Sequence, residues 1–300
     1  MNEAYKKQVA LLLKILPEVA VEKNFALHGG TAINLFEQNF PRLSVDVDLT
    51  YTTFGDRTQD LKTIRLLLED LKTRIQKRIP TNRYSNPIVA SENLKLICST
   101  SEATVKIEVN QINRGLIGES RLMPLCENAQ AEFDSFCEMS VVSAKQLWGG
   151  KVVAALDRQH PRDFFDINNL LTGTGFTEDI KSGFIFFLLC SNRPIHELLN
   201  PQLINHEAVF SSQFKGMTDQ PFSYKEYEEV RTLLIDTIHK SLTKDDKEFL
   251  LTFVKGEPTW DKVNYSMYPS IKWKSMNIDN LKRTNPEKFQ EQITLLKQLF

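Results

Sequence analysis

The fold of the N-terminal half is decided by the stretch Leu43-Ser-Val-Asp-Val-Asp-Leu-Thr-Tyr51. Its apolar and polar residues alternate with a period of two, which predicts a strand with one apolar and one polar face. Asp46 and Asp48 then project from the same polar face. Two carboxylates this close repel each other unless a cation lies between them, and Mg²⁺ prefers such hard oxygen ligands. A solvated strand face is the alternative interpretation, so the motif needs support from its surroundings.

A glycine turn precedes this strand. The segment Phe25-Ala-Leu-His28 is short and apolar, Gly29 and Gly30 interrupt it, and Thr31 begins a short helix that we expect to end at Gln38. Glycines between a strand and a helix let backbone N–H groups approach a phosphate, and the helix N-terminus adds a favourable dipole. The sequence therefore predicts a phosphate-binding turn, with an ordinary turn as the alternative.

A third carboxylate lies on another predicted strand. Residues 94–100 and 104–111 read as two paired strands, and Glu108 falls on the polar face of the second. If this strand neighbours the one that carries Asp46 and Asp48, three carboxylates converge, as a site for one or two metal ions requires. The alternative is a carboxylate that faces solvent.

A lysine in the second half of the chain borders an apolar helix face. The helix predicted from Ser143 to Asp157 buries Leu147 and Trp148, and Lys151 lies beside them. An ammonium group directed inward needs an anion, and a triphosphate would serve. Alternatively, the stem of Lys151 packs while its charge reaches solvent.

The segment His160-Pro-Arg-Asp-Phe-Phe-Asp166 begins the next predicted helix. Asp163 and Asp166 suit the positive end of a helix dipole, and Arg162 can pair with Asp166 at a spacing of four residues. The sequence supports this structural interpretation and a role in nucleotide binding about equally.

Two further helices carry weaker signals. The helix predicted over residues 5–23 contains Pro17, which we expect to end or kink it. The helix predicted over residues 58–79 has a basic stripe that suits either RNA phosphates or simple solvation. The stripe consists of Lys62, Arg65, Lys72, Arg74, Lys77 and Arg78.

The composition is that of a globular protein. The 300 residues are 41% hydrophobic and 25% charged, with a net charge of −1, so a global electrostatic hold on nucleic acid or membrane is not expected. The four cysteines form no C-x-x-C pair, and no apolar run is long enough to span a bilayer, which predicts a cytoplasmic protein. Strand patterns stop near residue 140, so we expect a mixed-sheet domain over residues 1–140 and a mainly helical domain over residues 141–300, an α+β fold.

Together these motifs resemble the AbiEii/AbiGii toxin family of nucleotidyltransferases, within the polymerase-beta-like superfamily. The resemblance also covers the C-terminal region, so that it spans nearly the whole chain. It rests on Leu27-His-Gly-Gly-Thr-Ala-Ile-Asn-Leu35, Arg42-Leu-Ser-Val-Asp-Val-Asp-Leu49, Lys106-Ile-Glu-Val109, Lys151-Val-Val-Ala-Ala-Leu-Asp-Arg158, Arg162-Asp-Phe-Phe-Asp-Ile167, Gly256-Glu-Pro-Thr-Trp260 and Ile271-Lys-Trp-Lys274.

The resemblance implies a site with separate metal-binding and nucleotide-binding residues. Asp46 and Asp48 would bind Mg²⁺ and act in catalysis, with Glu108 as a third ligand where the family commonly has aspartate. Lys151, which would contact the triphosphate, and Asp166 are expected to be catalytic. The residues expected to bind the nucleotide are Gly29, Gly30, Thr31, Ser44, Arg162 and Asp163.

The resemblance further implies a toxin of a toxin–antitoxin or phage-defence pair. The expected reaction is transfer of NMP from an NTP to RNA, with the tRNA acceptor end as the leading candidate. The expected protein partner is a cognate antitoxin, and a winged-helix repressor is one form that it could take. No association with a membrane is expected. Two alternatives stay open: transfer to a protein or small-molecule hydroxyl, and a non-catalytic NTP-binding module paired with an antitoxin.

Overall fold

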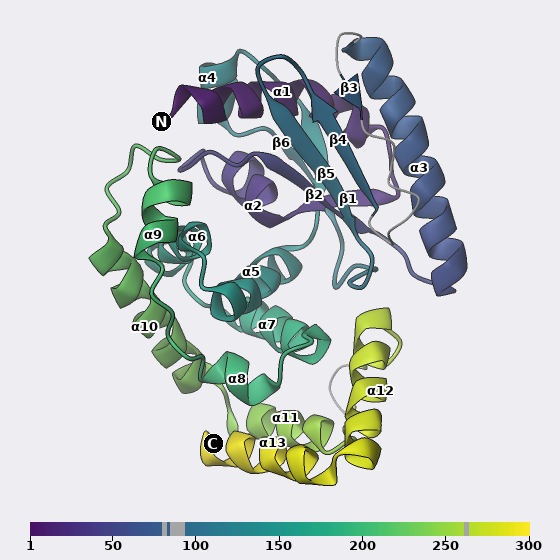
Figure 1. Ribbon diagram of the computed structural model, residues 1–300, viewed down its shortest axis with the longest axis vertical. Coiled ribbons are helices and arrows are strands. Elements are labelled where there is room, and N and C mark those ends of the chain that lie inside the picture. The colour runs from purple at the N-terminus through teal and green to yellow at the C-terminus, as the bar shows by residue number, and fades with distance from the viewer. Residues whose placement is uncertain (80–82, 85–93, 261–263) are drawn as a thin grey trace. The chain divides into compact units, whose positions relative to one another are not determined.

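A mixed sheet contains the D-x-D strand in the computed structural model, which describes residues 1–79, 83–84, 94–260 and 264–300 (Figure 1). Within these residues, seven strands pair in the order β3-β4-β5-β2-β1-β7-β6. The D-x-D strand β2 lies between β1, which is antiparallel to it, and β5, which is parallel. The strands are β1 Phe25–His28, β2 Asp46–Tyr51, β3 Arg83–Tyr84, β4 Lys95–Ser99, β5 Thr104–Asn110, β6 Arg121–Pro124 and β7 Glu138–Val141.

The sheet has an apolar face covered by two helices and a polar face at its centre. Val47 on β2 and Ile107 on β5 are in register and fully buried. Helix α1 (Glu3–Ala20) contacts β5, β7 and helix α3 (Arg57–Arg78), which in turn contacts β4. Because Ile97 on the other side of β4 is exposed, α1 and α3 cover the apolar face. The basic stripe of α3 therefore belongs to the opposite side of the sheet from Asp46 and Asp48.

Short helical segments complete the sheet-containing part. β1 leads directly into α2 (Gly29–Ala32), which continues as the π-helical turn η1 (Ile33–Glu37). The start of α3 is fixed by Asp56, whose side chain accepts a hydrogen bond from the Gln59 N–H at 3.0 Å. Between β6 and β7 lies α4 (Glu127–Phe133).

The described residues form two compact units. The first contains residues 1–143 and 214–221, and the second contains residues 144–213 and 222–300. The segment 214–221 returns to the first unit through backbone hydrogen bonds: Gly216 O accepts from the Asn2 N–H, and Met217 O accepts from the Leu43 N–H, each at 2.7 Å. The Thr218 hydroxyl also donates to Pro41 O. Residues 214–221 therefore belong to the first unit although they lie far beyond residue 140, so one boundary near that residue does not separate the two units.

The second unit is helical. Its helices α10 and α11 begin with capping boxes at Ser223 and Thr243, which satisfy the free N–H groups of their first turns. No helix in the described part of the chain is both long and apolar enough to cross a membrane. The elements are α5 Ala144–Arg158, α6 Pro161–Thr172, α7 Glu178–Cys190, α8 Ile195–Leu199, α9 Glu207–Val209, η2 Phe210–Phe214, α10 Tyr224–Ser241, α11 Lys244–Val254, α12 Pro269–Thr284 and α13 Pro286–Gln298.

Two findings go beyond what local sequence predicted. Of the two outcomes expected at Pro17, an end of the helix is excluded: α1 continues to Ala20, with Leu16 and Val19 buried on either side of the proline. Residues 115–139, which carry no clear period, nevertheless contain β6, α4 and the first half of β7. The strands β6 and β7 have four residues each, and their pairing with each other and with β1, rather than a local alternation, defines them.

Candidate active site

The D-x-D motif lies on the polar face of β2, as the alternation predicts. Val47 and Leu49 are fully buried on the other face, whereas Asp46 and Asp48 are half-buried. Asp48 is in register with His28 on β1 and with Glu108 on β5. The predicted adjacency of the two acid-bearing strands is therefore confirmed, and Asp48 is flanked on both sides by titratable side chains.

The glycine turn lies directly against Asp48. Gly29 has a φ of +74°, and a Cβ added to it would come within 2.5 Å of Asp48 Oδ2. A Cβ on Gly30 would lie 2.9 Å from Ser44 Oγ and 3.0 Å from an Nη atom of Arg42. Both glycines thus allow an approach that any side chain would block. Their backbone therefore lies beside Asp48, and the predicted contact of this turn with a phosphate stays a prediction.

Thr31 and Ser44 connect the turn to the D-x-D strand. The fully buried Thr31 hydroxyl donates to the Asp46 carbonyl oxygen at 2.5 Å and lies 3.0 Å from Ser44 Oγ. The Asn34 amide donates to Gly30 O at 2.9 Å. In the structure Thr31 therefore fixes the position of the turn, and its predicted contact with phosphate stays a prediction.

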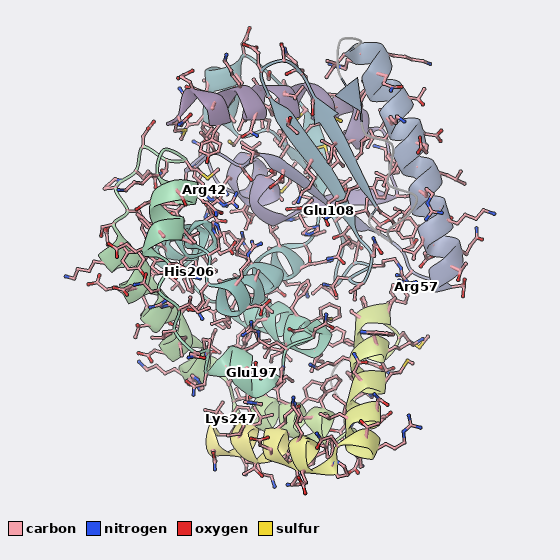
Figure 2. The ribbon with its side chains drawn as sticks, viewed as in Figure 1. Arg42, Arg57, Glu108, Glu197, His206 and Lys247 are labelled. Carbon is pink, nitrogen blue, oxygen red and sulfur yellow. The ribbon has the colours of Figure 1, made fainter. Side chains whose placement is uncertain are left out.

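Glu108 is held by two lysines. Figure 2 labels Glu108 on the sheet. Its Oε1 lies 3.1 Å from the Lys95 ammonium on β4, and its Oε2 lies 2.9 Å from the Lys106 ammonium on its own strand. Burial raises the pKa of Glu108, but the hydrogen bonds from Lys106 and Lys95 outweigh it and leave the pKa lowered. For Lys106, burial lowers the pKa, but the bond to Glu108 and the attraction of Asp46 leave it raised. Glu108 and Lys106 are therefore both charged near neutral pH.

The two aspartates fit a divalent cation better than the full set of three acids does. Their carboxylates provide hard oxygens on one face beside the glycine turn, and Mg²⁺ is commonly held by one or two carboxylates together with substrate phosphates. Both oxygens of Glu108 already accept from lysines. Among the described residues no group of three or more His, Cys, Asp or Glu is placed to hold a metal ion. The assignment of Glu108 as a third ligand stays a prediction.

A buried ion network unites most of the predicted residues of the second unit. The Lys151 ammonium on α5 lies 2.9 Å from Asp163 Oδ1 and 2.9 Å from Asp166 Oδ2 on α6. The side chains of the three residues are 5%, 1% and 0% exposed, respectively. Asp166 therefore pairs with Lys151 across two helices, and the stem of Lys151 does not carry its charge to solvent.

The exposed guanidinium of Arg158 closes this network. It donates twice to Asp163, at 2.6 and 2.9 Å. Burial raises the pKa of Asp163, but the attraction of Lys151 and the bonds from Arg158 outweigh it and hold the pKa well below its usual range. Arg162 is half-buried in the first turn of α6, where its N–H donates to His160 Nδ1 at 3.2 Å. Its contact with the nucleotide stays a prediction.

Sequence patterns missed four residues around the first-unit site: His28, Arg42, Lys95 and Lys106. His28 Nδ1 lies 3.0 Å from the Thr50 hydroxyl, which fixes the imidazole beside Asp48. Arg42 is 2% exposed, and Nη1 of its guanidinium group donates to Leu43 O. The alternation of polar residues on β4 and β5 marks the face of the two lysines, but only the strand register reveals their shared partner.

The Gly29→Ala variant is expected to lose nucleotidyl-transfer activity far beyond its loss of stability. The left-handed backbone costs roughly 1–2 kcal/mol for any residue with a Cβ, but here the new methyl also displaces Asp48. Gly175→Ala is the matched control, because Gly175 has a φ of +76° with nothing within 4 Å of the added Cβ. Urea unfolding and transfer rates measured on both variants test this: equal activities would show that the approach of Gly29 to Asp48 is unimportant.

Known proteins share both the sequence motifs and the fold. The sequence model of the family described as "Nucleotidyl transferase AbiEii toxin, Type IV TA system" matches residues 10–274. The structure is similar to MenT4, the nucleotidyltransferase toxin Rv2826c from Mycobacterium tuberculosis H37Rv, with a TM-score of 0.60 over 92% of this chain and 95% of that chain. The two sequences are 12% identical, so this likeness concerns the fold. Curated protein sequences gave no match.

The aspartate pair beside a glycine turn thus belongs to an enzyme of the nucleotidyltransferase class. More narrowly, the chain is a member of the AbiEii family of nucleotidyltransferase toxins, from type IV toxin–antitoxin systems. The resemblance found in the sequence motifs and the α+β fold are confirmed. Membership implies an NTP as substrate and an antitoxin as partner.

Proposed function

We propose that this toxin transfers NMP from an NTP to RNA, with the tRNA acceptor end as its target, in the presence of Mg²⁺. The observation that supports the proposal is the close approach of the Gly29 backbone to Asp48, because the glycine turn then lies beside two carboxylates on one sheet face. The choice of RNA as acceptor rests on the similarity of some family members to enzymes that extend tRNA. The basic stripe of α3 gives it no support, because it lies on the other side of the sheet.

The chemistry assigned to this face is an in-line displacement at the α-phosphorus. The acceptor hydroxyl oxygen bonds to the α-phosphorus, its proton goes to Asp46 or Asp48, and pyrophosphate leaves with the electrons of the broken P–O bond. A Mg²⁺ ion held by the two aspartates would neutralise phosphate charge and align the reacting oxygens. The turn at Gly29 and Gly30 would orient the triphosphate through its backbone N–H groups.

The second unit is proposed to assist at the triphosphate. Arg162 and Asp163 keep their predicted roles as nucleotide-binding residues, and Lys151 and Asp166 keep their predicted roles in catalysis, with Lys151 at the triphosphate. These roles rest on the family resemblance. The structure adds that Lys151 and Asp166 are a coupled pair, so neither can be replaced without affecting the other.

Label transfer tests the proposal. The protein is incubated with each α-labelled NTP, Mg²⁺ and total tRNA, and the products are separated into RNA and protein fractions. We expect label on RNA, lost when EDTA is added, and mass analysis of the tRNA then gives the added nucleotide. Label on protein alone would instead select a protein hydroxyl as acceptor. NTP binding without any transfer would indicate a binding module and contradict the proposal.

A further inference from the structure

Lys95, Lys106 and Glu108 form a cluster on the polar face of the sheet, which we call the lysine clamp. Lys95 on β4 is in register with Glu108 on β5, and Lys106 precedes Glu108 by two residues on the same strand. The single carboxylate bridges both ammonium groups, at 3.1 and 2.9 Å. The Lys95 and Lys106 ammonium groups are therefore held close together by the carboxylate group between them.

The lysine clamp still has N–H donors and a net positive charge after its internal ion pairs are made. It carries two positive charges and one negative charge, and an ammonium group has three N–H donors, of which the bond to Glu108 takes one. The Lys95, Lys106 and Glu108 side chains are 35%, 38% and 33% exposed, so the remaining donors can reach an external anion. A phosphate oxygen is an acceptor that suits two such cations.

The position of the clamp relative to Asp48 indicates which phosphate it meets. The strand order β4-β5-β2-β1 places the clamp on one flank of the D-x-D strand and the glycine turn, which follows β1, on the other. In an in-line displacement the attacking oxygen and the leaving pyrophosphate lie on opposite sides of the α-phosphorus. If the triphosphate lies against Gly29, the acceptor approaches from the side of β5 and β4.

We infer that the lysine clamp binds backbone phosphates of the acceptor RNA strand, with Glu108 as the residue that positions Lys95 and Lys106. This inference rests on the proposed function, because it assigns the acceptor of the same reaction to one flank of the site. It also gives Glu108 a task other than the metal contact predicted from sequence.

The double variant Lys95→Gln/Lys106→Gln tests the clamp. Binding of a fluorescent single-stranded oligoribonucleotide is measured by anisotropy over a series of salt concentrations. We expect affinity to fall about tenfold, and the slope of log K against log salt to become shallower by about 1.4, since each phosphate contact on a single strand contributes about 0.7. The KM for tRNA should rise while the affinity for a non-hydrolysable NTP analogue stays unchanged.

The control is Lys62→Gln/Lys77→Gln. It makes the same change in net charge at two exposed lysines of α3, on the opposite side of the sheet. Urea unfolding checks that all variants are folded. The inference is overturned if the control weakens RNA binding as much as the clamp variant does. It is equally overturned if the clamp variant loses NTP affinity but keeps RNA affinity, or keeps both.

Glu108→Gln separates positioning from metal binding. As a positioning residue, it should alter the KM for tRNA and leave the Mg²⁺ concentration for half-maximal rate unchanged; a rise in that concentration with an unchanged KM for tRNA would contradict the inference. Failure of this inference can be told apart from failure of the proposed function, because in the latter case the unmodified protein itself labels no RNA.

Discussion

Replacement of Asp48 by asparagine is expected to lower the rate of nucleotidyl transfer by about 10²- to 10³-fold, the loss typical of removing one electrostatic contact to the transition state. Asparagine keeps the shape of the side chain but removes its charge, so the site loses half of its aspartate pair and the charge that a divalent ion needs. Asp48 lies between His28 and Glu108 and against the Gly29 backbone, and both oxygens of the neighbouring Glu108 carboxylate are already paired with lysines.

The measurement needs a control for charge and for folding. Asp70→Asn removes the same charge from an exposed position on α3 and should leave both the rate and the free energy of unfolding unchanged. Asp48 is half-buried on a strand face, so Asp48→Asn should stay folded in urea titrations. Metal-dependent NTP binding should weaken in parallel with the rate. A transfer rate within threefold of the unmodified protein would remove Asp48 from the site.

Local patterns were sufficient to predict the central part of this site. The alternation from Val45 to Leu49 predicts the strand and puts both aspartates on one face, because side chains in a strand alternate strictly. The paired glycines predict a sharp turn, since only glycine adopts the left-handed backbone of Gly29 without strain. These features depend on residues within a few positions of each other, which a sequence displays directly.

Other features depend on register and on contacts between distant residues. The partners of Glu108 lie on two strands, and a shift of one residue between β4 and β5 would turn Lys95 to the other face. Lys151 could be recognised as a cation beside an apolar stripe, but its acids are 12 and 15 residues further along, on another helix. The return of residues 214–221 to the first unit likewise rests on hydrogen bonds to residues near the N-terminus.

Replacement of Lys151 by methionine is expected to lower the free energy of unfolding by about 3–5 kcal/mol, because removing one partner of a buried ion pair leaves the other charge without its counterion. The buried Asp163 and Asp166 side chains each lose the ammonium that lies 2.9 Å away, although Arg158 still donates to Asp163. Lys145→Met on the same helix is the control. Lys145 pairs with the exposed Asp179, and such surface pairs contribute about 0–1 kcal/mol.

Stability must therefore be separated from catalysis before Lys151 is assigned a role at the triphosphate. The double variant Lys151→Met/Asp166→Asn removes both charges of the pair, so we expect it to recover part of the stability lost by Lys151→Met alone, as a thermodynamic cycle of the four proteins in urea would show. If the folded double variant remains inactive but binds RNA, then Lys151 or Asp166 acts on the nucleotide. If it regains activity together with stability, the pair serves the fold of the second unit, and a loss of toxicity in Lys151→Met reports unfolding. If Lys151→Met alone left the free energy of unfolding unchanged, that result would contradict the burial of this ion pair.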